Sequence, residues 1–282
     1  MTLPRLVLGT LSAIVAIQVA TWTAVRPSAA GKATPMTAFW QAPGDLGARD
    51  LFTGPWGAAN APDPKATYRF VHLKKAGANP GVVVTDPSGS RVEGGGRFRL
   101  EHESLKEQGN WSWRMNPFVG TRPYQGLLVI LLMFASPDFK NSNNMLYDVT
   151  REGSTEQWYV VRDLGGALGE FGIVRPKRND PILFEQQGFI TGFAKGFVEF
   201  DHPIKQRALV EGRITPSEVA WAGNLLAGLS ERQWQDAFRA GGYNPDVAAR
   251  FIRKIRLNIA AAQQISVDPP DHQARLRFRR TD

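Results

Sequence analysis

The chain of 282 residues contains no cysteine, and this absence excludes several classes of protein. Without thiols there are no disulfides, no thiolate zinc sites, no iron–sulfur clusters and no cysteine nucleophile. The four histidines lie far apart and form no HxxxH or HxH pair, so they predict no histidine-based metal site. The GxSxG motif of many serine hydrolases is also absent. No pair of carboxylates is placed by a motif either, which disfavours a glycosidase.

The charge is unbalanced toward positive values, with 34 Lys and Arg against 26 Asp and Glu, a formal net charge of +8. Such an excess favours anionic partners in general. The basic residues are nevertheless spread along the chain, apart from a cluster at 275–280, and no basic helix with interleaved aromatic residues is present. A solvated surface is therefore the favoured interpretation, and no nucleic acid partner is expected.

Residues 6–25 form a run of 20 without any charge, preceded by the basic Arg5 and followed by the small residues Ser28, Ala29 and Ala30. This pattern is typical of a secretory signal peptide with cleavage after Ala30. The run is also long enough for an uncleaved membrane anchor, and a buried helix is a third alternative. The first two alternatives predict an exported protein, periplasmic or extracellular, with possible membrane anchoring through residues 6–25.

Strands are predicted in the first half of the chain and helices in the second. Short apolar or alternating runs predict strands at 66–73, 82–84 and 97–100, and a hairpin at 145–149 and 157–162. Residues 124–135 contain eight consecutive apolar residues after Pro123, which favours a helix buried on all sides. Capping signals at Thr215, Ser230 and Asn244 open three further helices. The predicted class is α+β.

Polar residues gather in the loop after the buried helix. Asp138, Lys140 and Asn143 lie in this loop, and Asp163 follows the predicted hairpin. A rigid helix and a rigid hairpin would thus bring two carboxylates and several amides together. Such oxygen ligands suit Mg²⁺ with substrate phosphates, and an Asp base, a Lys and a metal-bound Asp are the minimum set for phosphoryl transfer. The alternative is an ordinary polar turn, because Asp, Asn and Ser dominate turns.

The segments DFKNSN (138–143) and DLG (163–165) resemble the catalytic loop and the metal-binding triplet of protein kinases, with spacing similar to the phosphoinositide and HipA-type kinases. The resemblance implies Asp138 as the base and Lys140 on the transferred phosphoryl group. It implies Asn143 and Asp163 as ligands of Mg²⁺ or Mn²⁺, with ATP as the phosphate donor and an unknown acceptor. Two segments, PFVGTRPYQG (117–126) and YVVRDLG (159–165), are also similar to a group of exported bacterial proteins. This similarity implies no substrate.

The kinase resemblance implies a small, incomplete β-rich N-terminal lobe and a mainly helical C-terminal lobe. The expected division is a leader at 1–30, an irregular segment with the truncated lobe at 31–115, the helical lobe at 116–265, and a basic tail at 266–282. The departures lie in the small lobe. Only 39 residues separate positions 84 and 124, without a glycine-rich loop or a VAIK-like strand. Lys74 and Lys75 are the nearest candidates for a phosphate-binding lysine, and a degenerate, non-catalytic binding or scaffold protein is the alternative.

Overall fold

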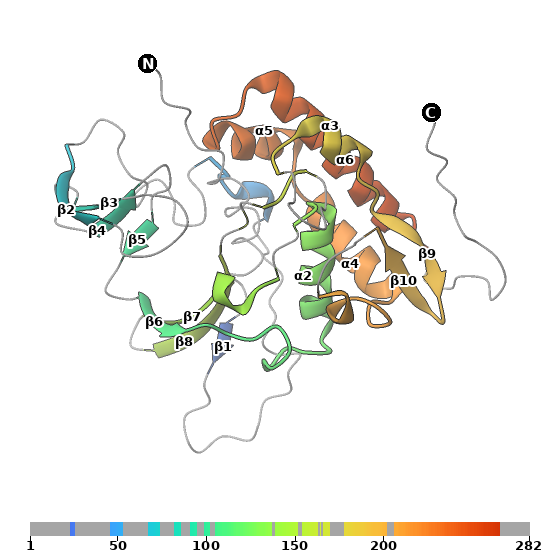
Figure 1. Cartoon of the computed structure of the whole chain (residues 1–282), viewed down its shortest axis with the longest axis horizontal. Helices are drawn as coiled ribbons and strands as arrows, with labels where there is room; N and C mark the ends of the chain where they lie inside the picture. The colour runs from blue at the N-terminus through green and yellow to red at the C-terminus, as the bar shows by residue number, and fades with distance from the viewer. Residues whose placement is uncertain are drawn as a thin grey trace.

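A computed structural model describes residues 23–25, 46–52, 67–73, 82–85, 91–94, 99–101, 105–136, 139–151, 154–162, 164, 166–169, 178–201 and 206–265. Within these residues the chain is a mixture of helices and small antiparallel sheets, in agreement with the predicted α+β class (Figure 1). Asp138, Asp163, Lys74, Lys75, the basic tail and all of the predicted leader except 23–25 lie outside the described residues.

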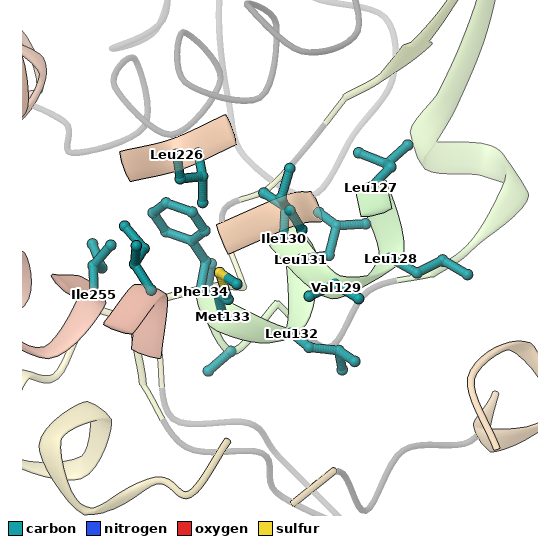
Figure 2. Packing of buried hydrophobic residues seen from close by; sticks show 14 of the residues in the cluster. Leu127, Leu128, Val129, Ile130, Leu131, Leu132, Met133, Phe134, Leu226 and Ile255 are labelled. Atoms are coloured by element: carbon teal, nitrogen blue, oxygen red, sulfur yellow. The ribbon is translucent and has the colours of Figure 1, made fainter. Parts of the chain in front are cut away.

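The predicted buried helix is α2, Arg122–Met133. The Thr121 hydroxyl accepts the N–H of Tyr124, and Pro123 lies in the first turn, where a missing N–H leaves no bond unmade. Every residue from Tyr124 to Met133 is buried, so the helix is the centre of the hydrophobic core (Figure 2). This position explains why the run is apolar on all sides.

Three further helices complete the helical part of the chain, all as predicted: α4 (Pro216–Ala227), α5 (Glu231–Ala240) and α6 (Pro245–Gln263). Capping boxes at Thr215 and Ser230 begin α4 and α5, and the Asn244 side chain accepts an N–H at the start of α6. The helix α4 packs against both α2 and α6, and α5 packs against α6. Leu226 of α4 and Ile255 of α6 lie beside Phe134 in the core (Figure 2).

The predicted hairpin consists of β7 (Asn144–Arg151) and β8 (Ser154–Val161), which extend further toward the turn than expected. It belongs to a four-stranded antiparallel sheet of order β1-β8-β7-β6. Two members of this sheet were not predicted: β6 (Leu105–Gly109) and β1 (Thr23–Val25), the latter within the predicted leader. Glu107 lies in β6, which pairs with β7, and its side chain is exposed.

A second sheet precedes this one in the chain, with order β2-β3-β4-β5: Arg69–Leu73, Val82–Thr85, Arg91–Gly94 and Arg99–Glu101. It is antiparallel throughout, and β2, β3 and β5 overlap the strands predicted at 66–73, 82–84 and 97–100, of which 66, 97 and 98 lie outside the described residues; β4 was not predicted. In Figure 1 this sheet lies at the opposite side of the molecule from α3 and α6.

The segment between the hairpin and α4 contains elements that were not predicted. These are α3 (Pro181–Gln186) and the hairpin β9 (Ile190–Ala194) and β10 (Phe197–Phe200); the short turns η2 (Leu46–Ala48), η4 (Asn141–Asn143) and η5 (Arg207–Leu209) complete the described elements. Among the helices of the described residues, none has the length and apolar character needed to cross a membrane.

Candidate functional site

The polar loop predicted as a catalytic loop follows α2, and its described part is anchored at Phe139. This side chain is 2% exposed and packs edge-on against Trp113, with ring centres 5.4 Å apart. The carbonyl of Phe139 accepts a hydrogen bond from Nε2 of Gln206 at 2.6 Å. The backbone directly after position 138 is therefore held on two sides.

Residues 111–113 form a buried support beneath the loop. The N–H of Trp113 donates to Oδ1 of Asn141 at 3.2 Å, and Nδ2 of Asn144 donates to the carbonyl of Trp111 at 3.1 Å. The indole N–H of Trp111 reaches the carbonyl of Val160 in β8 at 3.1 Å. One short segment thus connects η4, the start of β7 and the end of β8, so the loop and the hairpin form one framework.

The end of the hairpin is tied to the loop by a backbone hydrogen bond. In the β7–β8 ladder Asn144 lies opposite Val161, and one position further the N–H of Arg162 donates to the carbonyl of Asn143 at 2.6 Å. The Arg162 guanidinium is held in the same sheet by Glu107, at 2.6 Å, and by the hydroxyl of Tyr147, at 3.0 Å. The chain therefore reaches position 163 one residue beyond a fixed contact with Asn143.

The predicted site residues divide into two groups. Lys140 is exposed and Asn143 is half-buried in η4, whereas Asp138 and Asp163 lie outside the described residues, so the predicted convergence of the two carboxylates stays a prediction. The structure does bring the backbone of Asn143 and the residue before Asp163 together. Sequence reasoning missed the supporting residues 111–113 and Gln206, which carry no recognisable spacing toward the loop.

The side chain of Asn143 offers one test of whether a metal–phosphate group fits this site. Its Nδ2 atom is buried and has no hydrogen-bond partner among the residues that the structure describes, a state that costs about 1–3 kcal/mol. An unsatisfied amide beside the loop fits an incoming polar group, and its oxygen is a ligand type that Mg²⁺ accepts. The described residues contain no group of three or more His, Asp or Glu placed to hold a metal. Any magnesium site here therefore depends on Asp138 and Asp163.

Backbone strain is concentrated where α2 ends. Ala135 (φ 48°), Leu168 (φ 61°) and Asn179 (φ 56°) adopt left-handed conformations without being glycine, which costs about 1–2 kcal/mol each for alanine or leucine. Backbone hydrogen bonds connect the segments that contain these residues. The N–H of Leu168 donates to the carbonyl of Phe134 at 2.9 Å, and the N–H of Asn179 donates to the carbonyl of Ala167 at 3.1 Å. Such strain gathers at functional sites, where the surrounding structure enforces it.

Burial shapes the electrostatics behind the loop. It raises the pKa of Tyr124 to about 12, and the phenol O–H donates a hydrogen bond to the carbonyl of Trp113. Tyr124 is therefore neutral over the physiological range and acts here as a hydrogen-bond donor that fixes the support segment. The sequence gives only its place in α2, not this role.

Comparison of the chain with protein-family models, with curated proteins and with solved structures finds no match.

Proposed function

We propose that this chain is an exported protein with a kinase-like catalytic core, which binds ATP with Mg²⁺ or Mn²⁺ and transfers a phosphoryl group to an acceptor still to be identified. The observation that carries the proposal is the hydrogen bond from the Arg162 N–H to the Asn143 carbonyl. It brings Asn143, the last residue of the DFKNSN segment, beside the residue that precedes the DLG segment, and this proximity supports the proposal. Buried helix, polar loop, hairpin and second Asp also follow one another in the order that such a core requires.

The proposal assigns separate roles to the site residues. Asp138 accepts the proton of the acceptor hydroxyl, and Lys140, which is exposed at the start of η4, contacts the transferred phosphoryl group. Asn143 and Asp163 hold the cation, which supplies charge neutralisation for the phosphates. Phe139 and the support segment at 111–113 keep the loop in place during the transfer, because catalysis of this class depends on positioning and electrostatics.

A second candidate function is a nucleotide-independent binding or scaffold protein of the same core. It is favoured by the sheet β2-β3-β4-β5, whose described strand residues include no lysine. A kinase would use a strand lysine to hold the nucleotide phosphates. This alternative predicts a folded protein whose stability does not respond to nucleotide or metal.

Nucleotide binding by the purified full-length chain separates the two candidates. ATP at about 1 mM should raise the melting temperature in the presence of Mg²⁺ or Mn²⁺ and much less in its absence. If the ligand concentration is 100 times the dissociation constant, the stabilisation is about 2.7 kcal/mol, or roughly 5–10 °C. Asp163→Asn should abolish the metal-dependent part of the shift.

Asp246→Asn is the matched control, because Asp246 is an exposed carboxylate in the first turn of α6. It should bind nucleotide as the wild type does. Asp138→Asn should retain binding but lose phosphoryl transfer, since its proposed role lies in the chemical step. Absence of any shift with the wild-type chain and ATP, Mg²⁺ or Mn²⁺ would reject the enzyme and leave the scaffold alternative.

A further inference from the structure

We propose that Tyr243 and Asn179 form a latch that positions the chain directly after Asp163, the backbone at 164 and 166–168, for binding of the metal–nucleotide complex. The latch is the hydrogen bond from the Tyr243 hydroxyl to Oδ1 of Asn179, at 2.7 Å. The expected effect of the latch on Mg-ATP binding rests on the proposed function, whereas the hydrogen bond itself can be tested without nucleotide.

The tyrosine end of the latch is fixed in the helical core. The ring of Tyr243 lies edge-on to Phe238 of α5, with centres 4.9 Å apart, and to Phe251 of α6, at 5.6 Å. Its N–H donates to the carbonyl of Phe238 at 3.2 Å. Burial raises the pKa of Tyr243, so the phenol remains a proton donor at every physiological pH. The hydroxyl is therefore presented at a defined point.

The asparagine end reaches the candidate site through the backbone. Asn179 is exposed, yet it is held in the left-handed conformation, which asparagine tolerates better than most residues. With that conformation its N–H donates to the carbonyl of Ala167, and the next N–H, that of Asp180, donates to the carbonyl of Leu168 at 2.8 Å. The hydrogen bond from Tyr243 restrains the Asn179 side chain and so adds to the backbone bonds that hold this conformation.

The segment held in this way is also anchored from the other side. Leu164, Ala167 and Leu168 are buried, and the N–H of Leu168 donates to the carbonyl of Phe134 at the end of α2. Before Asp163, the N–H of Arg162 is bound to Asn143. The described residues that precede and follow position 163 are therefore held, and the latch supports those that follow it. Residues that orient a metal-binding side chain tune the affinity for the metal although they do not contact it.

The first test is hydrogen exchange in the full-length Tyr243→Phe variant, which keeps the ring and removes only the hydroxyl. Loss of one partly exposed hydrogen bond should speed exchange at the amides of Asn179 and Asp180 about three- to tenfold, while the amide of Leu128 in α2 stays unchanged. Unchanged exchange at Asn179 and Asp180 would overturn the latch.

The second test measures the dissociation constant of Mg-ATP. Tyr243→Phe and Asn179→Ala should weaken binding about threefold or more, with ATP binding in the absence of metal unaffected. Asn179→Asp should restore near-wild-type affinity, because it keeps both the acceptor and the tolerance of the left-handed conformation. Ile259→Val, a buried residue of α6 outside the latch, is the control for stability: it should lower the melting temperature without altering the metal dependence.

The outcomes separate the latch from the proposed function. Faster exchange with unchanged Mg-ATP affinity would overturn the positioning role and leave a merely structural hydrogen bond. If the wild-type chain binds no nucleotide, the proposed function and the role in binding both fall, and the exchange rates still decide whether Tyr243 holds the segment. Faster exchange together with weaker, metal-dependent binding supports both proposals.

Discussion

Replacement of Gly126 by alanine should disturb the contact between α2 and α4. A Cβ atom built on Gly126 would lie 2.3 Å from Cζ3 and 2.4 Å from Cε3 of Trp221, far inside normal van der Waals contact. The indole of Trp221 would have to move by about 1 Å or more to reach an ordinary separation near 3.5–4.0 Å. Gly126 is buried at the centre of the core, so the ring cannot shift without displacing its neighbours.

Two opposing effects set the magnitude for Gly126→Ala. Overpacking of a buried site destabilises by about 1–3 kcal/mol. Alanine is favoured over glycine inside a helix by about 1 kcal/mol. A contact of 2.3 Å places the overpacking cost in the upper part of this range, about 2–3 kcal/mol, so the net loss should be about 1–2 kcal/mol. At roughly 2–4 °C per kcal/mol this corresponds to a fall in melting temperature of several degrees.

A double-mutant cycle with Trp221→Leu checks this reasoning. In the Trp221→Leu background the added methyl group has space, and Gly126→Ala should become neutral or stabilising through the helix propensity alone. Urea denaturation of the four proteins gives the coupling free energy. Gly47→Ala is the control, because a Cβ at Gly47 would have no atom within 4 Å. Gly126→Ala equal to or more stable than wild type in the original background would refute the proposed close contact.

Two further predictions concern a turn and the response to alkaline pH. The turn between β9 and β10 places Lys195 (φ 53°) and Gly196 (φ 82°) in left-handed conformations, so Lys195→Asn should raise the free energy of unfolding by about 0.5–1 kcal/mol. Gly196→Ala should lower it by a similar amount, both measured in urea. Because burial raises the pKa of Tyr124 to about 12, above its unfolded value near 10, its contribution to stability is complete below pH 10 and is lost as the pH rises toward 12. By pH 11 this loss is about 1.4 kcal/mol, and Tyr124→Phe should remove it; an equally steep decline in the variant would contradict the assignment.

The parts of the fold that were predicted have strong local signals. The helices α4, α5 and α6 begin at residues whose side chains cap them, and these patterns are visible without knowledge of the tertiary structure. The buried helix α2 was predicted from an uninterrupted apolar run. The hairpin β7–β8 was predicted from two apolar strands flanking a glycine-containing turn. In each case the same residues that specify the element also form its contacts.

The parts that were missed depend on distant partners. The strand β6 (Leu105–Gly109) has polar residues at its three central positions, and its strand conformation follows from pairing with β7 about 40 residues later. The hairpin β9–β10 turns at Lys195 and Gly196, and lysine in a left-handed position is not a turn signal that a sequence pattern reveals. For such segments the tertiary environment outweighs local propensity.

The candidate site also combines features that the sequence reveals with features that depend on distant residues. Phosphoryl transfer was predicted from the residue types and order of Asp138, Lys140, Asn143 and Asp163. A carboxylate, an ammonium group and an amide have the same chemical properties in any fold, so the sequence alone reveals them. The described part of the loop is instead held by groups without distinctive chemistry: the side-chain amide of Gln206 donates to the carbonyl of Phe139, and the backbone N–H of Trp113 donates to Asn141. These bonds use common residues and backbone atoms, which leave no trace in spacing. Substitutions in this supporting set should therefore alter the geometry of the loop while every residue of the kinase-like pattern remains in place, and nucleotide binding by such variants tests whether the pattern works as a site.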